Sequence, residues 1–309
     1  MIFFDSYGHQ FYTDGIVEKY PNVRFFHATG DLAHTKSFPN LYNAFASIYD
    51  GRYLAGIAAG LKLNEIKAAG KLKGEVPMIG YVGAYTYAEV ISGYTSFYLG
   101  AKSVCPDVIM KVQFTGEWYD QQLEKDAAEA LIAAGADLIS QHADSMGAPT
   151  ACEDAGIPNV SYNISTEKDC PNTFLVYSRI NWAPYFKYII EKTAAGEEIP
   201  TDWVGTIDTN SVIVTGLNEA VAAEGTQAAI DAATAEIVAG TLHVFDVAKD
   251  NYITVNGEKV TTFTFEPDTD YAKEVIADGY FHESEDGYRS APYFNLFIDG
   301  IELLNQIYD

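Results

Sequence analysis

The chain has 309 residues, of which 48% are hydrophobic, so it can bury the core of one large domain or of two ordinary ones. Its formal net charge is −24 without a compensating basic patch, which argues against binding to nucleic acid. No run of about 18 apolar residues is present, and the first residues lack the basic region of a signal peptide, so neither a membrane span nor a signal peptide is predicted.

The first quarter of the chain begins with a strand. An apolar run at residues 2–6 predicts this strand, residues 14–20 a short helix, and residues 23–27 a second strand. Apolar residues then recur at helical spacing over residues 39–63, which predicts one long helix whose glycines permit close packing. Residues 64–76 are charged and predict a connector.

The middle of the chain alternates strands with helices. Strands are predicted at residues 78–84, 108–114, 138–141, 159–162 and 174–180. Helices are predicted at residues 88–104, from an Asp120 N-cap to a stop at Gly135, and at residues 146–155 and 184–193. This alternation predicts βαβ units and a parallel sheet.

The pattern changes after residue 205. A short strand is predicted at residues 211–214 and an alanine-rich helix at residues 227–239. The Asn-Gly pair inside the alternating stretch 252–263 predicts a hairpin with a type I′ turn. Residues 292–308 predict a final helix.

Three strand ends in the middle of the chain carry polar and aromatic residues, at positions 115–120, 141–145 and 161–163. In an open α/β sheet the carboxyl ends of the strands line one crevice, where ligands bind. Trp118 is therefore either a ring that stacks on a flat ligand or a tryptophan of the core. Asp144 either accepts hydrogen bonds from a ligand or caps the next helix, and both roles can coexist. His142 is interpreted as an interior histidine.

The sequence contains none of the common motifs for catalysis, cofactor binding or metal binding. There is no nucleophile elbow, dinucleotide fingerprint or phosphate loop, and no histidine lies at zinc-like spacing, so no catalytic residue, cofactor or metal is predicted. Cys105, Cys152 and Cys170 make an odd number. Either Cys152 and Cys170 form one bridge, or all three are free thiols that pack as small apolar groups.

Several motifs occur together in one order. They lie at residues 25–30, 49–56, 79–84, 114–120, 135–137, 141–145 and 181–185. In this order, from residue 1 to about 245, they resemble the basic-membrane-protein family of substrate-binding lipoproteins, whose members include purine-nucleoside receptors of ABC importers.

The resemblance implies an α/β fold with the two Rossmann-like lobes of a type I periplasmic binding protein, which close on a ligand between them. We expect residues 1–77 and 182–205 to form a first lobe that is incomplete at its N-terminus. Residues 78–181 and 206–309 then form the second lobe, with an extra hairpin and tail. The family's leader and first βαβα segment precede the position that aligns with residue 1, so we expect self-association through the incomplete lobe.

The resemblance also implies a set of ligand contacts. Trp118 matches the ring that stacks on the purine, and Asp144 and Asn163 match polar contacts to base or ribose. The remaining matches are the turn at Ser6, Tyr7 and Gly8, a second-lobe ring at Tyr85, and a basic ribose contact at Arg179.

The predicted function is that of an extracytoplasmic solute-binding protein without catalytic turnover, lipid-anchored in the full-length family form. It would bind a purine nucleoside or a similar flat, hydroxylated solute and deliver it to the permease subunits of an ABC importer. Two alternatives remain: a nucleoside hydrolase or phosphorylase, and a ligand-sensing module on the same scaffold.

Overall fold

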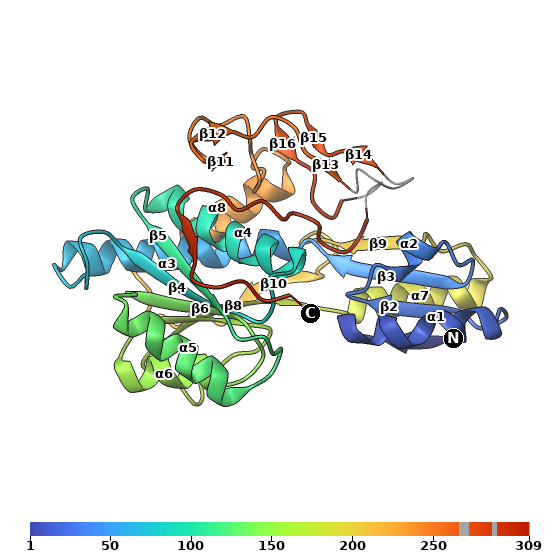
Figure 1. The fold of residues 1–309 in the computed structure, drawn as a ribbon, viewed down its shortest axis with the longest axis horizontal. Coiled ribbons are helices and arrows are strands. Elements are labelled where there is room, and N and C mark those ends of the chain that lie inside the picture. Colours follow the sequence, from blue (N-terminus) through green and yellow to red (C-terminus); the bar gives the residue numbers. More distant parts are fainter. Residues whose placement is uncertain (266–271, 286–288, 309) are drawn as a thin grey trace. The chain divides into compact units, whose positions relative to one another are not determined.

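The computed structural model describes residues 1–265, 272–285 and 289–308 (Figure 1). The chain forms two compact units. Unit 1 comprises Met1–Ser47, Ile180–Ile213 and His282–Tyr293, and unit 2 comprises Ile48–Arg179, Val214–Phe281 and Phe294–Asp309.

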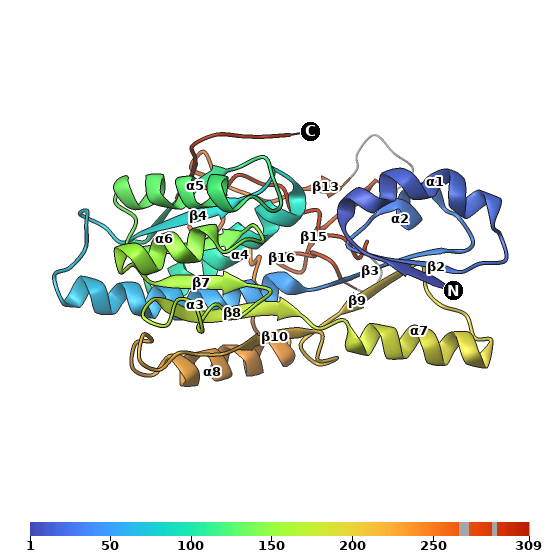
Figure 2. The ribbon, with the colours of Figure 1, turned by 90° about the horizontal axis from the view of Figure 1, so that it is seen from below.

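Unit 1 is built on a four-stranded parallel sheet in the order β1 (Ile2–Phe4), β2 (Phe25–Ala28), β3 (Leu41–Ala46) and β9 (Asp202–Gly205). Its helices are η1 (Tyr7–His9), α1 (Gln10–Lys19), α2 (Leu32–Lys36) and α7 (Ala183–Ala195). Successive side chains of a strand point to opposite faces. Phe25 accordingly packs with Val17 and Leu32 on the side of α1 and α2, whereas Phe26 packs with Tyr185 and Ile189 of α7. Figure 2 shows these helices on the two faces of the sheet.

The predicted helix at residues 39–63 is wrong in its first part. Those residues form β3, which is followed by helix α3 (Ile48–Ala68). β3 pairs with β2 on one side and β9 on the other, and its residues are almost all buried. A strand buried on both faces is a near-continuous apolar run, which periodicity alone cannot separate from a helix that follows it. The predicted connector at 64–76 likewise begins inside α3.

Unit 2 contains a seven-stranded sheet. Its order is β10 (Val212–Thr215), β8 (Phe174–Ile180), β7 (Asn159–Tyr162), β6 (Leu138–His142), β4 (Met78–Gly83), β5 (Ile109–Phe114) and β17 (Ile301–Leu303). From β8 to β17 the neighbouring strands are parallel, which confirms the predicted α/β fold with parallel pairing. Two strands of this sheet cross between the units. β8 runs from unit 2 to its last residue, Ile180, in unit 1, and β10 begins in unit 1 and ends in unit 2.

Helices cover both faces of this sheet. α3 and α4 (Ala88–Val104) pack together on one face, and α5 (Gln121–Ala133) and α6 (Gly147–Ala155) on the other (Figure 2). α8 (Thr226–Val238) packs on α3. The predicted N-cap of α5 is confirmed, because the Asp120 carboxylate accepts hydrogen bonds from the backbone N–H groups of Gln122 and Leu123, both at 2.9 Å.

Glycines set the close approach of α3 and α4. A Cβ atom at Gly56 would lie 2.1 Å from the Phe97 carbonyl oxygen, and one at Gly100 would lie 2.0 Å from the Tyr53 carbonyl oxygen. The two backbones therefore touch where a side chain would separate them. The expectation that glycines of this segment permit close packing is confirmed.

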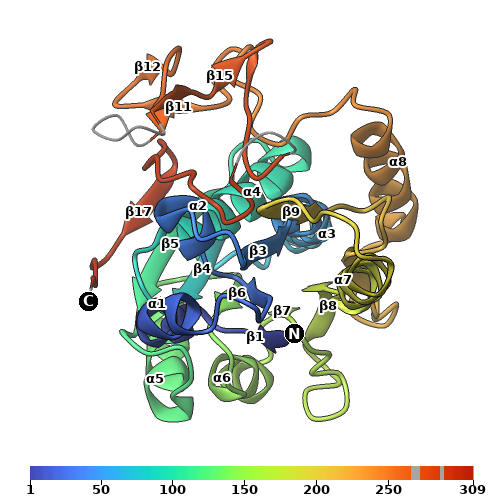
Figure 3. The ribbon, with the colours of Figure 1, turned by 90° about the vertical axis from the view of Figure 1, so that its right-hand side faces the viewer.

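The tail after residue 244 contains short hairpins. They pair β11 (Thr254–Val255) with β12 (Glu258–Lys259), β13 (Thr264–Phe265) with β14 (Lys273–Glu274), and β15 (Ile276–Ala277) with β16 (Tyr280–Phe281). Figure 3 shows the hairpins on the α4 side of unit 2, with α5 and α6 on the opposite side. The predicted Asn-Gly hairpin is confirmed, because Asn256 and Gly257 have φ values of 53° and 79°, as a type I′ turn requires.

The predicted helix at residues 292–308 is wrong. Residues Ile301–Leu303 form β17, which extends the sheet beside β5. The Asn305 side chain then bonds both the backbone N–H and the carbonyl of Phe114, at 2.8 and 2.9 Å. Free backbone groups at the edge of β5 thus override the local helical spacing.

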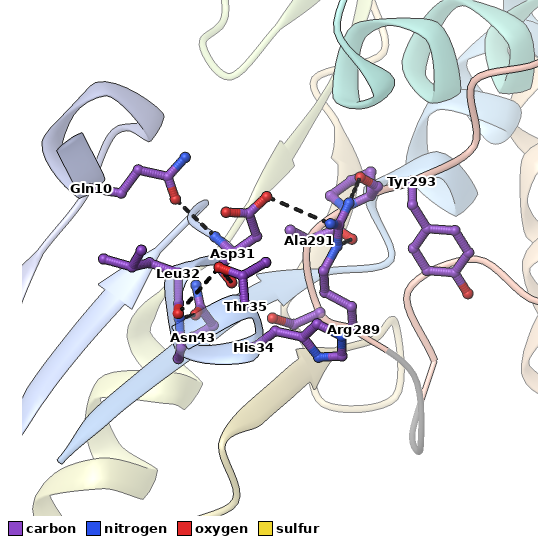
Figure 4. A network of polar contacts seen from close by, with 12 residues as sticks. Gln10, Asp31, Leu32, His34, Thr35, Asn43, Arg289, Ala291 and Tyr293 are labelled. Carbon is purple, nitrogen blue, oxygen red and sulfur yellow. Dashed lines mark hydrogen bonds and ion pairs between the residues drawn. The ribbon is translucent and has the colours of Figure 1, made fainter. Parts of the chain in front are cut away.

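The division into units differs from the predicted lobes. α3, which we placed in the first lobe, belongs to unit 2 because its glycines hold it against α4. The tail segment His282–Tyr293, which we placed in the second lobe, belongs to unit 1. There Ser290 donates from its N–H and its hydroxyl to the Asp202 carboxylate, at 2.9 and 2.7 Å. Arg289 lies 3.5 Å from the Asp31 carboxylate (Figure 4).

The three cysteines are buried free thiols, so the bridge between Cys152 and Cys170 is not formed. Burial raises the pKa of the Cys170 thiol to about 11, which keeps it protonated and unreactive at neutral pH.

Replacing Gly56 by alanine is expected to lower the free energy of unfolding by about 1–3 kcal/mol or more, because the new methyl group forces α3 away from α4. Urea unfolding measures the change. Gly15→Ala is the matched control, since nothing lies within 4 Å of a Cβ at that helical position. It should be neutral or stabilise by up to about 1 kcal/mol. Equal effects of the two substitutions would contradict the packing argument.

Candidate functional site

The candidate site lies in unit 2, where β7, β6, β4 and β5 are consecutive in the sheet. Because these strands are parallel, the loops that follow them leave the same edge. The sheet therefore gathers residues that are far apart in the sequence. The predicted cluster at 115–120 follows β5, whereas the clusters at 141–145 and 161–163 begin in the last residues of β6 and β7. The loop after β4 leaves the same edge.

Three partly buried rings form an aromatic group at this edge: Tyr85 and Tyr87 after β4, and Trp118 after β5. The Tyr85 and Tyr87 rings stack with centroids 5.2 Å apart. Trp118 lies 5.6 Å from Tyr85 and 6.2 Å from Tyr87, tilted to both. The rings support one another in the preferred range of aromatic contacts while each keeps some exposed surface.

Polar groups adjoin this aromatic group. The Asp144 backbone N–H donates to the Trp118 carbonyl oxygen at 2.9 Å. The side chain of Asn163 lies close enough to the Asp144 carboxylate to lower its pKa. Asn163 itself has a left-handed backbone, with φ of 65°, and its N–H donates to the Ser178 carbonyl at 2.9 Å. The structure thus brings together Trp118, Tyr85, Asp144 and Asn163, four of the predicted ligand contacts.

Asp144 is exposed and is not the cap of the following helix. Met146 occupies the N-cap of α6 without a side-chain bond, and the Ser145 hydroxyl accepts from the Gly147 N–H at 3.0 Å. Partial burial and the neighbouring Glu89 carboxylate raise the pKa of Asp144, whereas the Asn163 side chain and the charge of Arg52 lower it. The carboxylate therefore remains available to a ligand.

The loop that carries Asp144 is anchored by a buried acid. The Glu124 carboxylate on α5 accepts from the Ser145 N–H at 3.1 and 3.2 Å and from the Asp120 N–H at 3.1 Å. Burial raises the pKa of Glu124, and these donors oppose that rise. Glu124 thereby fixes the start of α5 to the end of β6.

A buried layer lies beneath the aromatic group. His142 is fully enclosed, with its Nε2 atom 3.4 Å from the Glu89 carboxylate and its ring 4.8 Å from the Tyr162 ring. Burial, and then the charge of Arg52, lowers the pKa of His142 to about 4. The ring is neutral at pH 7, and the prediction of an interior histidine is confirmed.

Arg52 of α3 completes this layer. Its side chain is only 1% exposed, and its guanidinium carbon lies 3.4 Å from the centroid of the Tyr162 ring. Sequence reasoning assigned no role to Arg52, Glu89 or Tyr87, and it included Tyr162 only as a member of the cluster at 161–163. A lone arginine within the apolar segment of α3 was the available signal.

The other predicted ligand contacts lie elsewhere in the chain. Ser6, Tyr7 and Gly8 form a turn in unit 1 after β1, where Ser6 has φ of 69° and its carbonyl accepts from His27 Nε2 at 3.0 Å. Arg179 is partly buried near the end of β8, at the boundary of unit 2. Their contact with a ligand stays a prediction.

Within residues 1–265, 272–285 and 289–308, no three His, Cys, Asp or Glu side chains are grouped as metal ligands. In the same described part of the chain, no helix is both long and apolar enough to cross a bilayer.

The fold and the polar, aromatic strand edge are of the kind in which α/β proteins bind small molecules. The chain belongs to the Bmp family, because the family model described as "ABC transporter substrate-binding protein PnrA-like" matches residues 1–244. The predicted family is thereby confirmed.

Two curated relatives share recognisable sequence identity with the chain. It is 37% identical over 186 residues to a purine-binding protein of Brucella abortus, which covers 60% of the chain and 49% of that protein. It is 32% identical over 206 residues to a protein of Haloferax volcanii named as an ABC transporter glucose-binding protein, covering 66% and 49%. The chain therefore spans about half the length of these curated relatives.

The solved structure shows the fold. An ABC transporter solute-binding protein from Aeropyrum pernix matches 81% of this chain and 78% of its own, with a TM-score of 0.66 and 15% identity. The predicted fold of the periplasmic-binding-protein type is confirmed.

Acidification is expected to destabilise the chain through His142. The folded-state pKa of about 4 lies below the unfolded value of 6.5, so His142 contributes stability above pH 6.5 that is lost as the pH falls toward 4. Between pH 7 and pH 5 this loss is about 2 kcal/mol. His142→Gln should remove that part of the pH dependence in urea unfolding. His9→Gln, at an exposed position, should keep it. The same pH slope in His142→Gln and the wild type would contradict the assignment.

Proposed function

We propose that this chain is the solute-binding component of an ABC importer and that it binds a purine nucleoside or a similar flat, hydroxylated solute without turnover. The observation that carries the proposal is the convergence of Trp118 with Asp144 and Asn163 at the carboxyl edge of the unit 2 sheet. The name of the Brucella relative supports a purine.

The chemistry of the edge suits such a solute. A planar base offers a π-face to the Trp118 indole, and stacking tolerates any base. The Asp144 carboxylate only accepts hydrogen bonds at neutral pH, whereas the Asn163 amide both donates and accepts. Together these side chains match the N–H donors, carbonyl acceptors and hydroxyl groups of a nucleoside. Tyr85, Arg179 and the turn at Ser6, Tyr7 and Gly8 are the further contacts that the family correspondence proposes.

A sugar is the second candidate, because the Haloferax relative is named for glucose. Carboxylates and amides also bind sugar hydroxyls, and an indole can pack against a pyranose ring. A free sugar, however, has no aromatic face for the ring of Trp118.

Calorimetry with inosine, guanosine, adenosine and glucose tests the proposal. At least one nucleoside should bind with measurable heat, and glucose should not. Trp118→Ala should weaken binding by about 1–3 kcal/mol through lost stacking. Tyr20→Ala, at an exposed ring of unit 1, should leave it unchanged. Chromatography of the same mixtures, with and without added inorganic phosphate, should reveal no free base. Release of base would favour a nucleoside hydrolase or phosphorylase, and binding of glucose alone would defeat the nucleoside assignment.

We also propose that the protein acts outside the cytoplasm, anchored by lipid as in the full-length family form, and that it docks on permease subunits. The family supports this location. Recovery of a kinase or regulator instead of permease subunits in a pull-down would favour the sensing module.

Self-association through unit 1 is a further part of the proposal. β1 is the edge strand of its sheet, and Ile2 on it is 48% exposed. An apolar edge strand is a template for pairing with another chain. Sedimentation should show association that rises with concentration and that Ile2→Lys weakens. Ile190→Lys, at a similarly exposed position of α7, is the control. A strictly monomeric wild type would contradict this part.

A further inference from the structure

Among the fully buried side chains that the structure describes, the largest is a charged one, Arg52 of unit 2. Arg52 lies on α3 and is 1% exposed. Its Nη1 atom donates to the Gln141 carbonyl at 3.0 Å, while its Nε and Nη2 atoms are buried without a hydrogen-bond partner. Within the described part of the chain no carboxylate lies within ion-pair distance of Arg52. A buried charge held this way costs stability, so a purely structural role does not account for it.

The contacts of Arg52 join two strands of the site. Gln141 is on β6, three residues before Asp144, and Tyr162 ends β7, directly before Asn163. Arg52 therefore bonds the backbone of one strand and stacks on the terminal ring of the other, with 3.4 Å between its guanidinium carbon and the ring centroid. A planar guanidinium can make both contacts at once, which an ammonium cannot.

Helix α4 has a glycine, Gly93, where it faces His142 and Arg52, and the missing side chain leaves space for both. A Cβ atom at Gly93 of α4 would lie 2.6 Å from His142 Nδ1 and 3.7 Å from Arg52 Nε. His142 thus fills the space between α4 and the Tyr162 ring on which Arg52 stacks.

We propose that Arg52 is a positioning residue of the ligand site, which ties the carboxyl ends of β6 and β7 together so that Asp144 and Asn163 meet the solute in a fixed arrangement. This inference rests on the proposed function for the identity of the solute. It does not require Arg52 to touch the solute.

Electrostatics support the same role. The charge of Arg52 lowers the pKa of Asp144, against burial and the Glu89 carboxylate of α4, which raise it. The other titratable groups that interact with Asp144 are Glu124 of α5 and Tyr162 of β7, and His142 of β6 lies beside Arg52 and Glu89. Removing Arg52 therefore raises the pKa of Asp144, so that a ligand contact that needs the carboxylate is lost at a higher pH than in the wild type.

Arg52→Met and Arg52→Lys test the inference, with Arg24→Met as the control in unit 1. Two quantities are measured for each folded variant: the titration midpoint of the Asp144 carboxyl, by NMR without ligand, and the Kd for the nucleoside that the wild type binds, from pH 5 to 8. Circular dichroism verifies the fold. Arg52→Met should raise the midpoint and weaken binding roughly tenfold at pH 7, with a greater loss at lower pH.

Arg52→Lys separates the contacts from the charge. It should keep the Asp144 midpoint near that of the wild type and still weaken binding, because the ammonium cannot both stack and bond. If Arg52→Met does not fold, Arg52→Lys alone tests the inference. Unchanged midpoint and affinity in Arg52→Met, or unchanged affinity in Arg52→Lys, would overturn the inference. If the wild type binds none of the nucleosides while Arg52→Met moves the midpoint, the proposed function fails and only the electrostatic link between Arg52 and Asp144 stands.

Discussion

Parallel pairing in the unit 2 sheet is the constraint on which the site depends. β7, β6, β4 and β5 lie side by side in one direction, so each strand delivers the residues after it to the same edge. A shift of β6 by one residue would turn its buried side chains to the other face. The helices α3 and α4, held together by glycine contacts, cover one face of this sheet, and α5 and α6 cover the other.

The site combines an exposed layer with a buried one. The exposed layer offers an aromatic surface beside a carboxylate and an amide, which together can hold a flat polar molecule. The buried layer consists of Arg52, His142 and the Tyr162 ring, with the Glu89 carboxylate beside them. Because burial, and then the charge of Arg52, keeps His142 neutral, one positive charge rather than two is enclosed there. That charge in turn favours the ionised form of Asp144 at the surface.

Sequence reasoning predicted the parts of this arrangement that local patterns determine. Alternating strands and helices imply parallel pairing, and parallel pairing implies that Trp118, Asp144 and Asn163 share an edge. It did not separate β3 from α3, since both are apolar and adjacent. It also assigned a helix to the tail, because the free edge of β5 that β17 occupies is a property of the folded sheet. Arg52 was overlooked for a similar reason: its partners Gln141 and Tyr162 lie far along the chain and meet it only after folding.

The most direct measurement is a crystal structure of the chain with a bound nucleoside. The account predicts that the base packs on the Trp118 indole with ring centroids about 4.5–7 Å apart. It further predicts that Asp144 and Asn163 bond polar atoms of the base or ribose at ordinary hydrogen-bond distances. Electron density for the nucleoside at a place that touches none of these three side chains would contradict the central claim.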